Sequence, residues 1–193
     1  MFELCIHGRG GQGVVTAAEM VSVAAFIEGR HAQAFPNFGS ERMGAPVVAF
    51  ARIADKEIRN REPIMAPDAL IIQDPTLLFQ VDVFSGLKLE GYILINSSRS
   101  FGELGLGDLV ATHQAERLLT VPATEFAREH VGRPMPNAAL LGGFAALSGV
   151  LSLESVAAAI REKFPGKVGD GNVGAADAAY HYVQQQMKEF ANA

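Results

Sequence analysis

The chain has 193 residues, of which 49% are hydrophobic and 19% are charged, a balance typical of a globular protein with a sizeable core. Its formal net charge of −5 at pH 7 argues against non-specific nucleic-acid binding, which needs a basic surface. The sequence contains neither an apolar run of ~18 residues that would span a membrane nor a secretory signal, so we expect a cytoplasmic protein. We expect residues 1–193 to form a single domain.

The chain opens with a predicted strand, a glycine-rich turn and a predicted helix. An apolar run at residues 2–6 leads into the sequence His7-Gly8-Arg9-Gly10-Gly11-Gln12-Gly13, and a helical pattern follows over residues 14–29. This arrangement points backbone N–H groups and the positive end of a helix dipole at an anion. The other interpretation is a tight turn between strand and helix that binds no ligand.

The glycine spacing of this turn, Gly8-x-Gly10-x-x-Gly13, fits the dinucleotide-binding fingerprint. That fingerprint also needs an acidic residue at the end of the second strand to bind a ribose, and residues 31–36 contain neither Asp nor Glu. We therefore expect a contact with a phosphate or pyrophosphate group, and free NAD is not well supported as the ligand.

A short predicted strand at residues 31–35 is followed by a loop of mixed composition. Residues 36–46 combine two prolines and two glycines with the sequence Ser40-Glu41-Arg42. This loop is interpreted either as part of a binding site or as a surface turn that carries a solvated ion pair. The next predicted strand, at residues 47–53, has the clearest pattern of all.

Further strands are predicted at residues 68–73, 91–96 and 117–121, and the first two contain apolar runs of the kind that parallel sheets bury on both faces. Asp74 and Pro75 are expected to begin a helix, with Asp74 as its N-cap. Open α/β sheets bind ligands at the carboxyl ends of their strands. We therefore expect a crevice lined by residues 8–13, 36–46, 74 and 96–100.

The last part of the chain is predicted to be helical. A small-residue helix that begins at Asn137 has no clearly polar face, so we expect it to be buried. Ser152 is expected to cap the helix that follows. The helices are predicted at residues 122–130, 137–150, 153–164 and 172–190, with a loop at residues 165–171. Strands that alternate with helices predict an α/β fold: one doubly wound, mostly parallel sheet of about five to seven strands with helices on both faces, similar to the Rossmann fold.

The sequence contains no complete catalytic set. Cys5 is the only cysteine, so the chain cannot hold an iron–sulfur cluster, and we expect Cys5 to be a buried apolar residue. The five histidines are scattered, and no His/Glu cluster has metal-ligand spacing. Gly169-Asp170-Gly171 is similar to the start of a thiamine-diphosphate motif but lacks the rest of it, and we interpret it as a turn. A crevice without catalytic residues is ordinary for one subunit of a larger enzyme.

Three motifs together resemble the gamma subunit of the 2-oxoacid:acceptor oxidoreductases of the pyruvate:ferredoxin or flavodoxin type. They are the glycine turn at residues 8–13, the loop Phe38-Gly39-Ser40-Glu41-Arg42-Met43-Gly44-Ala45-Pro46, and Pro136-Asn137 before the small-residue helix. The loop is the specific part of the resemblance, which extends from residue 2 to about residue 183. It favours the pyruvate/2-oxoacid branch over the indolepyruvate branch.

The resemblance implies a subunit that is not catalytic alone. Such enzymes oxidatively decarboxylate a 2-oxoacid with coenzyme A (CoA) to an acyl-CoA and CO2, and pass electrons to ferredoxin or another acceptor. The resemblance places thiamine diphosphate between the alpha and beta subunits and 4Fe–4S clusters in the beta and delta-type subunits, so this chain alone would bind none of these cofactors. It implies alpha, beta and delta-type subunits as partners and CoA as co-substrate.

On this basis we hypothesise that the chain completes the CoA side of the cleft. Backbone N–H groups of residues 10–13 would meet phosphate oxygens, and Arg9 or Arg42 would add charge-assisted hydrogen bonds. Asn137 would either cap its helix or bind the ligand. The candidate binding residues are Gly8, Arg9, Gly10, Gly11, Gln12, Gly13, Ser40, Glu41, Arg42 and Asn137. Two other functions stay open: a free-standing nucleotide-binding oxidoreductase and a purely structural subunit.

Overall fold

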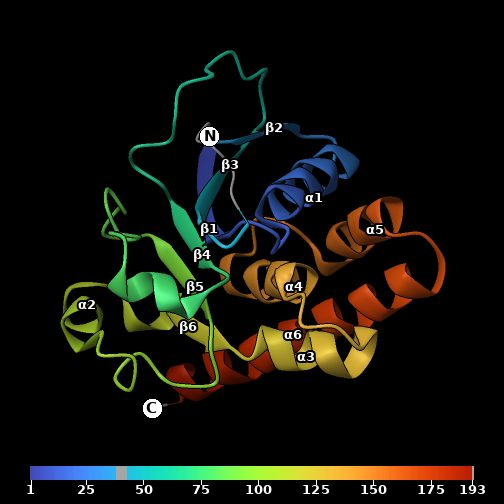
Figure 1. The fold of residues 1–193 in the computed structure, drawn as a ribbon. Helices are drawn as coiled ribbons and strands as arrows, with labels where there is room; N and C mark the ends of the chain where they lie inside the picture. The colour runs from blue at the N-terminus through green and yellow to red at the C-terminus, as the bar shows by residue number, and fades with distance from the viewer. Residues whose placement is uncertain (38–42, 193) are drawn as a thin grey trace.

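The computed structural model describes residues 1–37 and 43–192, and in this part of the chain six strands form one sheet (Figure 1). The strand order is β2-β3-β1-β4-β5-β6. Strands β1, β4, β5 and β6 pair in parallel, whereas β3 runs antiparallel to both of its neighbours, β1 and β2. The strands are β1 (Phe2–Arg9), β2 (His31–Pro36), β3 (Pro46–Ala54), β4 (Ala69–Ile72), β5 (Tyr92–Asn96) and β6 (Leu118–Val121). The prediction of a mostly parallel α/β sheet is therefore confirmed.

All six predicted strands are present, and the first extends further than its apolar run. Gly8 and Arg9 continue the ladder because they pair with Val47 and Pro46 of β3. The single reversed strand has a simple cause. The connection from β2 to β3 spans only residues 37–45, and strands joined by a short connection pair antiparallel, whereas parallel neighbours need a longer crossover.

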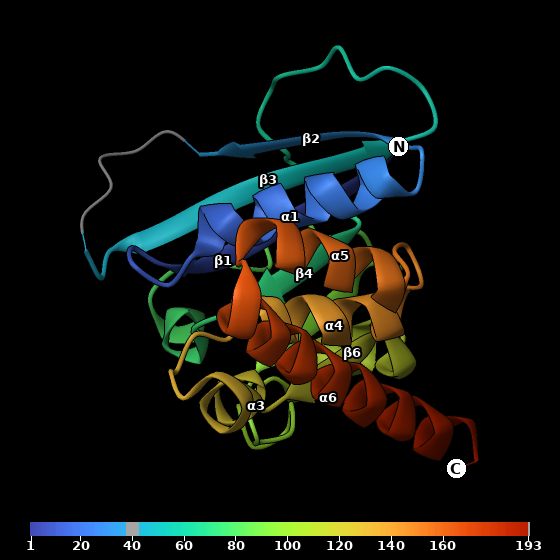
Figure 2. The same ribbon diagram turned by 90° about the vertical axis from the view of Figure 1, so that its right-hand side faces the viewer.

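One face of the sheet is covered by the long helices (Figure 2). Every second residue of the strands, such as Leu4, Ile6 and Leu94, points into a core between the sheet and helices α1, α4 and α6. Helices α3 and α5 pack against these helices. The helices are α1 (Val14–Ile27), α3 (Ala123–Val131), α4 (Asn137–Ser148), α5 (Leu153–Lys163) and α6 (Gly166–Ala191). The alternation follows from the two-residue period of a strand.

Short helices and irregular segments cover the other face. Cys5, Leu70 and Ile72 point into this second core, which is closed by residues such as Leu77 and Phe101. The helical pieces near this face are the 3₁₀-helix η1 (Pro75–Phe79), α2 (Gly107–Thr112) and the 3₁₀-helix η2 (Ala115–Arg117). Helices lie on both faces as expected, but the two layers differ strongly in regularity.

Helix α4 is buried, as its composition predicts, because it packs very closely against α6. A Cβ atom built on Gly142 of α4 would lie 2.0 Å from the carbonyl oxygen of Ala176 in α6. Only glycine allows two helix backbones to approach this closely at that point. The small residues of α4 therefore serve helix packing.

The predicted loop at residues 165–171 is wrong, because α6 already begins at Gly166. The glycines that suggest a loop pack against neighbouring backbone instead. A Cβ atom on Gly169 would lie 1.9 Å from the carbonyl oxygen of Phe164, and one on Gly171 would lie 2.6 Å from that of His130. The turn expected at Gly169-Asp170-Gly171 is therefore part of a helix.

Candidate functional site

The carboxyl ends of five strands meet at one edge of the sheet, together with the start of β3 (Figure 1). Residues 10–13 of the glycine turn follow β1 at this edge. Asp74 follows β4, and Asn96 is the last residue of β5. Hydrogen bonds among Gln12, Asp74, Gln73 and Asn96 join these three segments, so they lie together as expected, whereas residues 38–42 of the predicted crevice lie outside the described residues. This edge is called the carboxyl edge below.

The side chain of Arg9 links three segments at the carboxyl edge. Its Nε donates to Oδ2 of Asp74 at 3.0 Å, and Nη2 donates to Thr76 Oγ1 at 2.7 Å and to Gln80 Oε1 at 2.9 Å. Its Nη1 donates to the carbonyl oxygen of Gly44 at 3.0 Å. These bonds use four of the five guanidinium N–H groups, so Arg9 holds the glycine turn, η1 and the 43–45 segment together.

Gln12 and Asp74 complete this network. Gln12 Oε1 accepts from the backbone N–H of Arg9 at 2.8 Å, and its Nε2 donates to Asp74 Oδ2 at 2.8 Å. Burial of the Asp74 carboxyl opposes its ionisation, but hydrogen bonds from Thr76 and Gln12 and the charge of Arg9 outweigh burial and lower its pKa. Asp74 also accepts from the Thr76 backbone N–H at 3.0 Å, which confirms its predicted role as an N-cap.

Two glycines of the turn have backbone conformations that other residues rarely adopt. Gly11 has φ = +90° and Gly13, the N-cap of α1, has φ = +71°. The side chain of Met43 covers Gly11, and the amide of Asn137 lies next to Gly13. Within residues 1–37 and 43–192, no backbone hydrogen bond uses the N–H groups of Gly11 or Gly13.

Gly8 allows close packing, and Gly10 forms backbone hydrogen bonds. Gly8 lies within β1, and a Cβ atom there would be 2.5 Å from Cγ2 of Val14, so Gly8 allows the start of α1 to pack on the strand. The N–H of Gly10 donates to the carbonyl of Ala45 at 2.9 Å, and its own carbonyl accepts from Gly44 at 3.1 Å. Gly10 is therefore bound to the 43–45 segment.

Asn137 and Gln73 lie under the glycine turn. Asn137 is 2% exposed, and its Oδ1 accepts from the backbone N–H of Ala138 at 2.9 Å. Gln73 donates from Nε2 to the carbonyl of Gln12 at 3.1 Å, whereas its buried Oε1 accepts no hydrogen bond from the described residues. The sequence signals neither Gln73 nor Gln80 as part of this network, because a single glutamine carries no pattern.

Asn96 connects the central part of the carboxyl edge to α3. Its Nδ2 donates to the carbonyl of Gln73 and to Oγ1 of Thr124, both at 2.8 Å, and its Oδ1 accepts from the Thr124 backbone N–H at 3.1 Å. Asn96 thus caps the first turn of α3, the helix that follows β6. Its polar contacts are structural.

Three candidate residues, Ser40, Glu41 and Arg42, lie outside the described residues. In the part of the chain that is described, no cluster of three His, Cys, Asp or Glu residues has a geometry that would hold a metal ion. No helix in the same part is long and apolar enough to cross a membrane.

Burial shifts the pKa values of two side chains of β1, Cys5 and His7. Burial raises the pKa of the Cys5 thiol to about 12, so Cys5 is a buried, protonated residue as expected. Burial lowers the pKa of His7 to about 4, so its imidazole is neutral at pH 7. A protonated thiol is a poor nucleophile and a poor metal ligand, so Cys5 is not set up for either role at neutral pH.

A protein-family comparison matches residues 3–182 to the family of pyruvate ferredoxin/flavodoxin oxidoreductases. The chain is 47% identical to pyruvate synthase subunit PorC of Methanothermobacter marburgensis, over 95% of this chain and 98% of that protein. It is 46% identical to the common subunit gamma of the pyruvate/ketoisovalerate oxidoreductases of Pyrococcus abyssi, with the same coverage of 95% and 98%.

Solved structures show the same fold. The pyruvate oxidoreductase subunit PORC of Thermotoga maritima has a TM-score of 0.78 and 33% identity, over 93% of this chain and 95% of that chain. A 2-oxoglutarate:ferredoxin oxidoreductase of Magnetococcus marinus, solved with 2-oxoglutarate, coenzyme A and succinyl-CoA bound, has a TM-score of 0.71 and 15% identity. The match covers 96% of this chain but 31% of that longer chain.

Proposed function

The chain belongs to the pyruvate ferredoxin/flavodoxin oxidoreductase family, and we propose that it completes the CoA side of the active-site cleft in such an enzyme. The observation that carries this proposal is the match to gamma subunits over nearly their whole length. A chain of this kind is one subunit of an oxidoreductase and is not catalytic alone. Its partners are alpha, beta and delta-type subunits.

The enzyme that this subunit serves converts a 2-oxoacid and CoA to acyl-CoA and CO2. Pyruvate or a related 2-oxoacid is the substrate, and ferredoxin or a similar protein accepts the electrons. The relative from Pyrococcus abyssi is named as common to a pyruvate and a ketoisovalerate enzyme, which supports a subunit that does not choose the 2-oxoacid. Substrate choice then belongs to the other subunits.

The redox cofactors belong to those other subunits as well. Cys5, the only cysteine of the chain, is buried in β1 with its pKa raised to about 12, which does not fit a ligand of an iron–sulfur cluster. Gly169-Asp170-Gly171 lies inside α6 and does not fit a loop that binds thiamine diphosphate. Neither cofactor therefore contacts these residues.

The contact with CoA is assigned to the glycine turn. The N–H groups of Gly11 and Gly13 lie at the start of α1, where the helix dipole favours a phosphate or pyrophosphate group. Arg9 fixes the turn through its bonds to Asp74, Thr76, Gln80 and Gly44, and keeps one guanidinium N–H for the ligand. The Magnetococcus marinus enzyme, which contains this fold, was solved with CoA bound.

A purely structural subunit is the second candidate function. It is favoured by the side chains that already occupy the turn: Met43 covers Gly11, and Arg9 and Gln12 are both tied to Asp74. In that case the glycine turn packs against another subunit. Substitutions in the turn would then change the kinetics only when the assembly of the complex also fails.

A charge reversal at the glycine turn tests the CoA role. We expect Gly11→Asp in the assembled enzyme to raise the KM for CoA by about tenfold while decarboxylation stays intact, because a carboxylate repels the phosphate groups. Gly11→Ala is the matched control, since it meets the same positive φ and the same contact with Met43 but adds no charge. An equal KM for CoA in the two variants argues for the structural role.

Titration of the chain with NADH tests the remaining candidate, a free-standing nucleotide-binding oxidoreductase. We expect no change in NADH fluorescence, because residues 31–36 supply no acid for the ribose. Saturable binding of NADH by the chain alone would contradict the proposed subunit function.

A further inference from the structure

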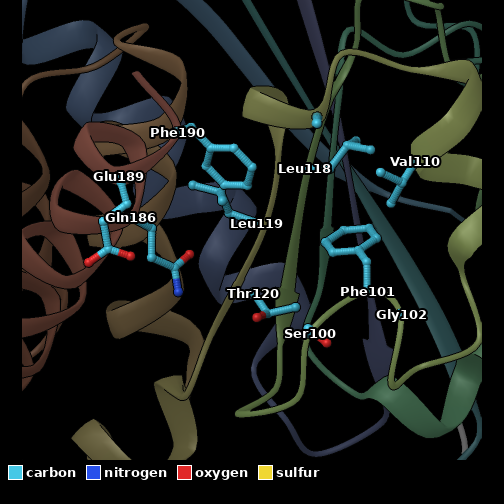
Figure 3. A pocket seen from close by; sticks show the side chains of 11 residues that line it. Ser100, Phe101, Gly102, Val110, Leu118, Leu119, Thr120, Gln186, Glu189 and Phe190 are labelled. Atoms are coloured by element: carbon cyan, nitrogen blue, oxygen red, sulfur yellow. The ribbon is translucent and has the colours of Figure 1, made fainter. Parts of the chain in front are cut away.

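A groove runs along the free edge of the sheet beside β6 (Figure 3). Strand β6 is last in the strand order and pairs only with β5 among the described strands. The hollow beside it has a volume of about 510 Å³ and lies between the C-terminal end of α6 and residues 100–110. It is remote in sequence from the glycine turn and is called the β6 groove below.

The backbone of β6 presents unpaired hydrogen-bonding groups to this groove. The carbonyl of Val121 accepts from the N–H of Ser97 at 3.0 Å, so Val121 directs its main-chain groups toward β5. Successive residues of a strand direct these groups to opposite sides, and Thr120 therefore directs its N–H and C=O away from β5. Within residues 1–37 and 43–192, no backbone hydrogen bond outside the ladder of β5 and β6 uses either group.

The walls of the β6 groove are mostly apolar. Phe101, Val110 and Leu118 form one wall, and Leu119 and Phe190 belong to the other (Figure 3). Phe190 is 47% exposed, which is a large apolar surface to leave in water. Glu189 is the one charged side chain on the walls, and it lies on the α6 side.

We propose that the β6 groove receives an extended segment of another subunit, which adds to β6 as a further strand. Unpaired main-chain groups between apolar walls fit this mode of recognition, in which the backbone supplies hydrogen bonds and the walls accept alternate side chains. The segment carries apolar residues toward Phe101 and Phe190 and a lysine or arginine opposite Glu189. That the occupant is a subunit of the oxidoreductase rests on the proposed function.

A second copy of this chain fits the groove poorly. Walls rise on both sides of β6, from α6 and from residues 100–110. If two copies met at their β6 edges, the walls of one copy would meet those of the other before the strands could pair. A single extended segment has no such walls, so it can reach the Thr120 backbone.

Hydrogen exchange in the assembled complex tests this inference. We expect the Thr120 amide to exchange at least about a hundredfold more slowly than an unstructured amide, because a strand hydrogen bond protects it. Carbodiimide cross-linking of the same complex should join Glu189 to a lysine of another subunit. Exchange of Thr120 close to the unstructured rate would overturn the inference, and so would cross-linking of Glu189 to a second copy of this chain.

A matched pair of variants separates strand addition from simple apolar contact. Thr120→Pro removes the outward N–H without removing a bond to β5, and proline is tolerated at such an edge position. We expect it to weaken assembly by about tenfold, while Thr120→Val, which keeps the N–H, changes assembly by less than about twofold. Equal assembly of the two variants would overturn the inference. Failure of the CoA role is seen separately, as an unchanged KM for CoA in the Gly11 variants.

Discussion

The Nε atom of Arg9 lies 3.0 Å from Oδ2 of Asp74, although 65 positions separate the two residues in the chain. The ion pair joins the last residue of β1 to the segment that follows β4. The chain places β2 and β3 on one side of β1 and places β4, β5 and β6 on the other side, so the strand order reverses between β1 and β4. Ligands of open α/β sheets bind at this reversal point, so Arg9 and Asp74 set the shape of the glycine turn there.

Removal of the Asp74 carboxylate should therefore loosen the carboxyl edge. We expect Asp74→Ala to lower the free energy of unfolding by about 2–4 kcal/mol, since it leaves Arg9 and Gln12 without their acceptor and removes the N-cap of η1. Urea unfolding at pH 7 measures the change. Asp82→Ala is the control, because Asp82 is exposed, and an equal loss in both variants would contradict the role of Asp74.

The pKa of Asp74 adds a pH signature to this comparison. Because the folded-state pKa is lowered, the stabilisation by Asp74 is present above its ordinary value of 3.8 and is lost as the pH falls below that value. We expect the difference in stability between the wild type and Asp74→Asn to shrink on acidification from pH 5 to pH 3. A difference that stays constant over this range would show that the charge of Asp74 does not contribute.

The buried His7 predicts a second loss of stability, at milder acid pH. The unfolded chain takes up a proton near pH 6.5, whereas the folded state resists protonation until about pH 4. Stability from this group is therefore full above pH 6.5 and falls by about 3 kcal/mol at most on approach to pH 4. Urea unfolding at pH 7.5 and 4.5 should show a smaller pH effect in His7→Leu than in the control His31→Leu.

Arg52 of β3 should be one of the most sensitive positions outside the carboxyl edge. Its side chain is 1% exposed, and it donates to Glu3 Oε1 at 2.8 Å and to the carbonyl of Glu62 at 2.7 Å. We expect Arg52→Met to lower the free energy of unfolding by about 2–4 kcal/mol, because the Glu3 carboxylate and the Glu62 carbonyl lose the donor that holds them. Arg59→Met, at a side chain that is 86% exposed, should change it by less than about 0.5 kcal/mol.

Gly142→Ala tests the close packing of α4 against α6. The added methyl group would meet the carbonyl of Ala176 at 2.0 Å, so the two helices would have to separate. We expect a loss of at least about 3 kcal/mol or failure to fold. Gly107→Ala is the matched control, since no atom lies within 4 Å of the added group. Thermal unfolding of both variants measures the effect, and similar melting temperatures would contradict the packing argument.

The strands could be predicted from the sequence because their apolar runs are continuous and bounded by turn residues. The strand predicted at residues 68–73 from four consecutive apolar residues is present as β4, one residue shorter at each end. The N-caps of helices could be predicted equally well. Asp74 precedes a proline and Ser152 precedes a helical pattern, and both side chains accept a hydrogen bond from the first turn of their helix. Local chemistry decides these features, so local sequence reveals them.

Contacts between distant segments could not be predicted in the same way. The glycines at positions 169 and 171 look like loop residues, yet they serve packing on Phe164 and His130 within a long helix. Likewise, the acceptors of Arg9, such as Gln80, become neighbours only when β1 and β4 pair. The glycine turn itself was visible in the sequence, but the network that fixes its shape was not.

Strand β1 lies inside the sheet, and this position has a consequence for synthesis of the protein. The first 54 residues already contain β1, α1, β2 and β3, and the later strands extend the sheet from β1 in the other direction. Helix α1 packs on β1, β2 and β3, whereas α4 and α6, which pack on β5 and β6, come from residues 137–191. On the ribosome, the nascent chain therefore exposes the apolar helical face of the later strands until translation is nearly complete, and this interval is when a chaperone has most to protect.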